Sequence, residues 1–67
     1  MNVFVNNMCE YLKDNMTMSY DKFERLYKLF CFDNFIHYDP CGLYRTVYKD
    51  DRFKLYDDEI EMMISVS

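Results

Sequence analysis

Residues 19–30, SYDKFERLYKLF, decide how the chain folds. Aromatic side chains recur there at spacings of three and four residues, the pattern of one face of an α-helix, at Tyr20, Phe23, Tyr27 and Phe30. Leu26 and Leu29 widen the same side, and charged residues occupy most of the opposite side. Ser19 is the expected N-cap, with Thr17 as the alternative. We therefore predict an amphipathic helix, which is too short to be stable alone and must be covered by the remaining chain.

Large side chains offset the small size of the protein. A domain of 67 residues buries only about 60% of the surface that its unfolded chain exposes. Aromatic residues make up 19% of the chain, all of them Tyr or Phe, and six Met residues can fill irregular gaps between them. A hydrophobic content of 51% with one Gly and one Pro argues against disorder. We expect one small folded domain over residues 1–67.

The N-terminal segment has two interpretations. Phe4, Met8, Tyr11 and Leu12 stand at helical spacing and predict a helix over residues 3–15. Residues 1–5 also fit a short strand. Residues 15–18 would form the connection to the next helix, and a connection this short makes the two helices antiparallel neighbours.

After residue 30 the pattern changes to a period of two. Residues 35–38 are consistent with a short strand, and Asp39-Pro40-Cys41-Gly42 has the composition of a type I turn. Residues 43–48, 53–56 and 60–66 alternate, with polar breaks at 49–52 and 57–59. The predicted class is α+β: two N-terminal helices packed on a C-terminal antiparallel meander of three strands, or four if residues 35–38 pair. The side chains expected to face the helix are Val47, Phe53, Leu55, Ile60, Met62 and Ile64.

Cysteine usage and the absence of a signal segment indicate a cytoplasmic protein. Three Cys residues, an odd number, follow a start with neither a basic nor an apolar region, which favours free thiols in a reducing compartment. No apolar run reaches the length of a membrane span, so we expect no membrane contact. The lack of Ala and Gln and the abundance of residues with AT-rich codons suggest a virus or bacteriophage, or otherwise an AT-rich bacterium. A viral protein would act in the host cytoplasm.

Metal binding and catalysis are poorly supported. Cys9, Cys31, His37 and Cys41 lack the paired spacing of a structural zinc site, and no spaced aspartate loop for calcium is present. A His37 and Cys41 nucleophile pair is disfavoured because Asp39 opposes a thiolate and the Pro-Cys-Gly turn offers no helix N-terminus. No Gly-rich phosphate loop occurs. We therefore expect no cofactor, no metal and no enzymatic activity.

Acidic residues cluster towards the C-terminus. Six of the twelve acids fall within twelve residues, at Asp50, Asp51, Asp57, Asp58, Glu59 and Glu61. Successive turns lie at opposite ends of a sheet, so only the last four are expected to form one coherent group. Tyr48 and Tyr56 are predicted beside them as rigid contact area. The net charge of -4 and the lack of a basic patch argue against direct nucleic-acid binding.

Two functional hypotheses follow from this surface. The first is an acidic protein-binding module, a viral or phage inhibitor that occludes the basic site of a host nucleic-acid enzyme or defence effector as a nucleic-acid mimic. The second is a self-associating structural or accessory subunit. It would use an exposed sheet face formed by Tyr44, Thr46, Tyr48, Lys54 and Tyr56, or pair as a homodimer along the strand at residues 60–66. The plainer interpretation is that the acidic turns are solvated and keep the domain soluble.

Overall fold

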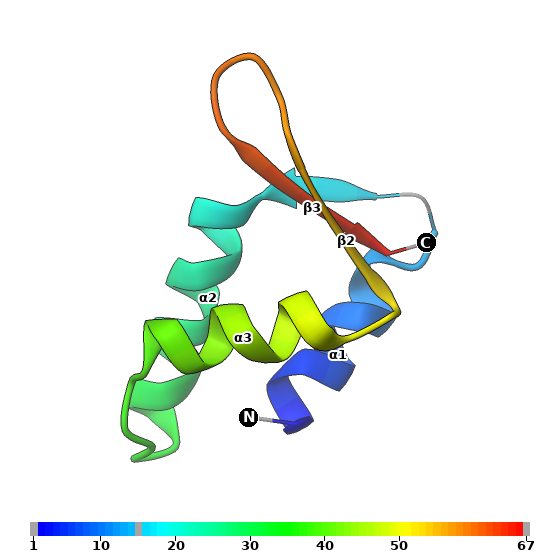
Figure 1. Ribbon diagram of the computed structural model, residues 1–67. Helices are drawn as coiled ribbons and strands as arrows, with labels where there is room; N and C mark the ends of the chain where they lie inside the picture. Colours follow the sequence, from blue (N-terminus) through cyan, green and yellow to red (C-terminus); the bar gives the residue numbers. More distant parts are fainter. Residues whose placement is uncertain (1, 15, 67) are drawn as a thin grey trace.

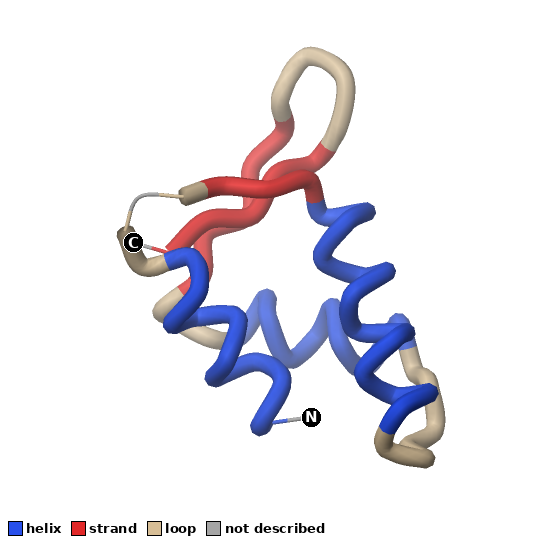
Figure 2. The backbone as a smooth tube through the Cα atoms, turned by 180° about the vertical axis from the view of Figure 1, so that it is seen from behind, coloured by secondary structure: helices blue, strands red, loops and turns tan. Residues whose placement is uncertain are grey.

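The computed structural model describes residues 2–14 and 16–66 and has the α+β class (Figure 1). Its elements are α1 (Asn2–Leu12), β1 (Thr17–Ser19), α2 (Tyr20–Asp33), α3 (Pro40–Lys49), β2 (Phe53–Asp57) and β3 (Met62–Val66). The strands form one antiparallel sheet in the order β1-β3-β2. All three helices lie on one side of this sheet, so the fold has two layers (Figures 1 and 2).

Helix α2 confirms the predicted central helix and its cap. Ser19 has extended backbone angles, and its Oγ accepts a hydrogen bond from the Lys22 N–H at 3.2 Å. The buried side consists of Tyr20, Phe23, Tyr27 and Cys31. The helix continues three residues beyond the predicted end, to Asp33. Cys31 therefore takes a core position, whereas Leu29, predicted to widen the apolar side, is 60% exposed.

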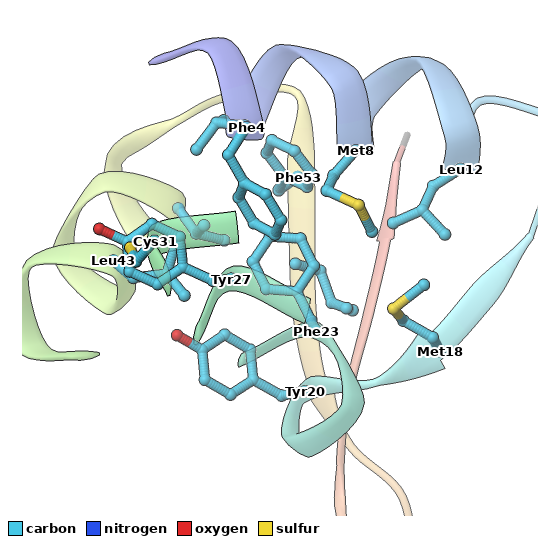
Figure 3. Close-up of a cluster of buried hydrophobic side chains, with 13 residues drawn as sticks. Phe4, Met8, Leu12, Met18, Tyr20, Phe23, Tyr27, Cys31, Leu43 and Phe53 are labelled. Atoms are coloured by element: carbon cyan, nitrogen blue, oxygen red, sulfur yellow. The ribbon is translucent and has the colours of Figure 1, made fainter. Parts of the chain in front are cut away.

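Helix α1 packs its apolar side directly on α2. The Phe4 ring lies 5.4 Å from that of Phe23 and 5.2 Å from that of Tyr27, between centroids (Figure 3). These tilted and edge-on contacts are the arrangements that aromatic quadrupoles favour. The helical interpretation is thus confirmed, and the alternative strand is wrong over residues 2–5. The helix ends at Leu12, and the predicted end at Asn15 lies outside the described residues.

The connection between these helices contains a strand that the sequence did not reveal. Strand β1 pairs with β3, with Met18 opposite Ile64, and both side chains are buried. The predicted meander is therefore wrong, because β3 lies in the centre of the sheet between β1 and β2. Three residues are too few to show a period, so this pairing depends on the position of β3 in space.

Residues 40–49 form helix α3 and not the predicted turn and strand. Asp39 is its N-cap: Asp39 Oδ1 accepts a hydrogen bond from the Gly42 N–H at 3.0 Å, and Pro40 occupies the first turn. Leu43 and Val47, four residues apart, are 0% and 1% exposed. The type I turn chemistry was misassigned because such a turn has nearly the backbone angles of a helical first turn. Alternation over six residues fits either structure when only two side chains must be buried.

Gly42 fits this cap because a side chain there would have no room. A Cβ built on Gly42 would lie 2.6 Å from Asp39 Oδ2. A larger residue would therefore push the capping carboxylate away from the N–H of residue 42, from which it accepts a hydrogen bond.

The β2–β3 hairpin agrees with prediction in its strands and differs at its tip. Strand β2 covers the predicted residues, and β3 begins at Met62, two residues later than predicted. Ile60 was expected to face the helix but lies in the loop and is 92% exposed. Residues 35–38 are irregular, so the possible fourth strand is absent from the described part of the chain.

The core joins all three helices to the sheet (Figure 3). Of the side chains expected to face the helix, Val47, Phe53 and Ile64 are buried. Leu55 and Met62 are partly buried against the same cluster. Val47 reaches this cluster from α3 and not from a strand. The prediction of its burial is therefore confirmed, although the secondary structure predicted for it is wrong.

Candidate functional site

A shallow groove of about 220 Å³ lies between α3 and β2. Its lining residues are Tyr44, Tyr48, Leu55, Tyr56, Asp57 and Met62. Residues 50–52 connect the two elements, so the chain that ends α3 returns at once as the strand beside it. This short connection brings side chains from a helix and a strand to one surface.

Three tyrosines form the contact surface of the groove. Tyr44 and Tyr48 lie one turn apart on α3, and their rings are stacked with centroids 6.0 Å apart and planes 19° apart. Tyr48 is 72% exposed, and Tyr56 joins the pair from β2 at 38%. The sequence placed these three tyrosines on one sheet face with Thr46 and Lys54. The structure brings the tyrosines together from two different elements, and neither Thr46 nor Lys54 lines the groove.

A buried tyrosine supports the groove from beneath. The Tyr20 ring meets that of Tyr44 edge-on at 5.9 Å, and its side chain is 8% exposed. Within the described residues its hydroxyl has no hydrogen-bond partner. Burial raises the pKa of Tyr20 to about 12, with the nearby Glu24 carboxylate adding to the shift. Tyr20 is therefore a neutral packing element that limits the movement of Tyr44.

The groove ends at an acidic segment, residues 57–61, which consists of the last residue of β2 and the loop that follows, and which we call the acidic hairpin. Asp57, Asp58, Glu59 and Glu61 are all exposed. The Asp58 N–H donates to the Glu61 carbonyl at 2.8 Å, and Asp58 Oδ1 accepts from the Glu59 N–H at 2.8 Å, so Asp58 connects both sides of the loop. Among residues 2–14 and 16–66, none of the ion pairs involves any of these four carboxylates. The loop projects beyond the remaining fold (Figure 1).

The other predicted acids lie apart from this loop. Asp50 and Asp51 precede β2, whereas the acidic hairpin begins where β2 ends, roughly 13 Å further along the strand. Asp50 Oδ2 accepts from Arg52 Nη2 at 2.7 Å, and Asp50 Oδ1 accepts from Arg52 Nε at 3.0 Å. These hydrogen bonds hold the pKa of Asp50 below its ordinary value. The charge of Asp50 is thus balanced by that of Arg52. The six acids form two separate groups, one at each end of β2.

The sulfur and imidazole groups are dispersed. Cys31 is buried, Cys41 is exposed in the first turn of α3, and His37 is exposed in the preceding loop. Our expectation that Cys41 lies away from a helix N-terminus is wrong, although the Asp39 carboxylate already caps that turn. Over residues 2–14 and 16–66, no group of three His, Cys, Asp or Glu side chains could hold a metal ion.

Two further observations concern the chain as a whole. None of the helices in the described residues is both long and apolar enough to cross a membrane. Comparison of the chain with protein-family models, curated proteins and solved structures gave no match. Function must therefore be inferred from the geometry of this molecule.

Proposed function

We propose that this protein is a non-catalytic binding module whose tyrosine groove and acidic hairpin hold a basic segment of a partner protein. The observation that carries the proposal is a groove lined by three tyrosines and Asp57, next to three further acids, with none of the four carboxylates in an ion pair among residues 2–14 and 16–66. Carboxylates without local partners attract a positively charged surface from a distance. Tyrosine rings then supply contact area at a low cost in side-chain entropy.

The edge of β2 supports an extended conformation for the bound segment. Among the described strands, β2 pairs with β3 alone. Alternate residues of such an edge strand direct their N–H and C=O groups away from the neighbouring strand. An extended segment can pair with these groups by strand addition, with its side chains against Tyr48 and Tyr56. Lysine or arginine in that segment would meet Asp57 at the end of the groove.

The biological consequence that we propose is inhibition by steric occlusion. A basic segment in a nucleic-acid enzyme or defence effector commonly contacts phosphates. An acidic module bound to this basic segment would prevent nucleic acid from binding there. The composition, which favours a virus or phage as the source, agrees with an inhibitor acting in the host cytoplasm.

The experiment is affinity capture from bacterial lysate followed by direct titration. The tagged protein and its Asp57→Lys/Glu59→Lys variant are compared at low and moderate salt. Each captured protein is then titrated into isotope-labelled wild type by NMR. We expect the variant to lose the partner and the wild-type shifts to map to Tyr48, Tyr56 and the acidic hairpin. Nucleic acid added as a competitor should release the partner.

A matched control separates local from total charge. Glu10→Lys/Asp14→Lys changes the net charge by the same amount, and both positions are exposed on or next to α1, away from the groove. This control should retain the partner. Retention of the partner by the folded Asp57→Lys/Glu59→Lys variant would refute the proposed role of the acidic hairpin.

A further inference from the structure

The C-terminal end of α2 exposes an apolar surface that neither the core nor the groove uses. Its residues are Leu29, Phe32, Phe35 and Ile36, at 60%, 81%, 99% and 40% exposure, and we call it the α2 apolar end. It lies at the opposite end of the molecule from the acidic hairpin (Figure 1). Contiguous apolar surface of this kind on a small protein marks an interaction site.

The backbone at Phe35 adds an independent observation. Phe35 has φ of +55°, the left-handed region, and is the described non-glycine residue with this property. The Ile36 N–H donates to the Cys31 carbonyl at 2.9 Å, the hydrogen bond of a Schellman C-cap. Glycine usually occupies this position because a Cβ strains the left-handed conformation. Phe35 is thus strained, and at 99% exposure it returns no packing energy to its own core.

A hollow lies beside the projecting ring. It has a volume of about 450 Å³ and is lined by Cys31, Phe32, Asp33, Phe35 and Ile36. Apart from Asp33, the residues that line this hollow are apolar, so each copy carries both an exposed ring and a largely apolar hollow. When two copies meet across a two-fold axis, the Phe35 ring of each can enter the hollow of the other, which is an isologous interface.

Area and charge both permit this pairing. At roughly 200 Å² for a phenylalanine side chain, Phe32 and Phe35 expose about 350 Å² per copy, so two copies would bury about 700 Å² from these rings alone. Leu29, Ile36 and the surrounding backbone extend this towards the lower bound of a specific interface, about 1,000 Å². The exposed charges at this surface have opposite signs: Lys28 lies beside it, and Asp33 lines the hollow. The acidic hairpins would lie at the far ends of the dimer, beyond effective repulsion.

We propose that the α2 apolar end binds a second copy of this chain, forming a two-fold dimer in which the Phe35 rings exchange between hollows. This interface is distinct from the tyrosine face considered for self-association on the basis of the sequence. It leaves both tyrosine grooves and both acidic hairpins open, so the dimer presents two binding sites pointing away from each other.

The test is sedimentation equilibrium of the full chain from micromolar to millimolar concentration, with the Phe35→Gly variant alongside. Wild type should approach twice the 8.3 kDa mass of the chain. Loss of a central aromatic contact should weaken dimerisation by about thirtyfold or more in Phe35→Gly. Because glycine relieves the strained cap, this variant should remain folded, which circular dichroism verifies.

Ile60→Gly is the matched control. Ile60 is 92% exposed at the acidic hairpin, so its removal deletes an equally exposed apolar side chain from the other end. It should leave the dimerisation constant unchanged. A wild type that stays at monomer mass up to millimolar concentration overturns the proposal and assigns the surface to a different partner. Unaltered dimerisation in folded Phe35→Gly overturns it equally.

Discussion

The two ends of this small molecule expose opposite chemistry. The acidic hairpin carries four carboxylates, and the hydrogen bonds of Asp58 connect both sides of its loop. The α2 apolar end carries two exposed phenylalanines, one of them on a strained backbone. Between them lies one shared core. The difference shows that a short chain can place charged surface and apolar surface at opposite ends of one molecule (Figure 1).

The largest expected effect concerns the buried tyrosines below the two surfaces. Tyr20 supports the groove, and Tyr27 lies beside Cys31, which lines the hollow. Burial raises the pKa of each to about 12, and for Tyr27 the Cys31 thiol contributes as well. Between about pH 10 and about pH 12, both tyrosine hydroxyls thus keep their protons in the folded state and lose them in the unfolded state. Full stability is present below pH 10 and falls above it, by roughly 1.4 kcal/mol per pH unit for each ring up to about pH 12.

Urea denaturation followed by circular dichroism between pH 8 and about pH 12 checks this slope. Tyr20→Phe should remove about half of it. At neutral pH that variant should also be at least as stable as wild type, because the buried Tyr20 hydroxyl has no hydrogen-bond partner among residues 2–14 and 16–66. A free energy of unfolding that is constant across this range would contradict the burial of both hydroxyls.

The second prediction contrasts the two surfaces in salt. Raising the ionic strength from about 0.05 M to 0.5 M should weaken binding of a basic partner at the acidic hairpin by about tenfold or more, because exposed charges are screened. Dimerisation through Phe32 and Phe35 should be unchanged or stronger, because apolar burial does not depend on charge. Parallel titration and sedimentation measurements at both salt concentrations provide the check. If salt weakened dimerisation as much as it weakened binding of the basic partner, the proposed difference between the two ends would be wrong.

The third prediction concerns the strained cap. Phe35→Gly should raise the free energy of unfolding of the monomer by about 0.5 to 1 kcal/mol, the relief of the left-handed strain less the added entropy of the unfolded chain. The free energy of unfolding is measured by denaturation at a protein concentration at which the chain is monomeric. Ile60→Gly has no such strain to relieve and should lower stability slightly. If Phe35→Gly proved the less stable of the two, the argument for stored strain would be wrong.

The smallest effect is expected at the turn that contains Asp50 and Asp51. Asp50 binds Arg52 and has a lowered pKa, so its contribution to stability is present above its ordinary value of 3.8 and is lost as pH falls through the lowered value. Asp50→Asn should cost less than about 1 kcal/mol, since the Arg52 side chain is 46% exposed. Asp58→Asn, in the acidic hairpin, offers the comparison at a carboxylate that forms no ion pair within the described part of the chain. Thermal denaturation at neutral pH and at pH 3 to 4 should show a pH-dependent difference from wild type for Asp50→Asn.

The sequence predicts one of these two surfaces in part and the other not at all. The acidic hairpin was identified because its four acids lie within five residues, so that proximity along the chain guarantees proximity in space. Tyr48 and Tyr56 were selected on the wrong premise of a shared sheet face, and the structure places them at one groove from α3 and β2. The α2 apolar end was missed. Phe32 could have revealed it. If the helix is continued beyond residue 30, Phe32 follows Lys28 by four residues and therefore falls on the polar side of the helix.

The sequence by itself determined the elements whose patterns are long or whose signals are local. Helix α2 followed from a stripe of four aromatic residues and the Ser19 cap, and β2 and β3 followed from alternation beside acidic breaks. Tertiary structure decided what short segments became. Residues 43–48 fit a strand and a helix equally, and the Asp39 cap with burial of Leu43 and Val47 selected the helix. Residues 17–19 became a strand because β3 offered an edge there, a reason that no local pattern contains.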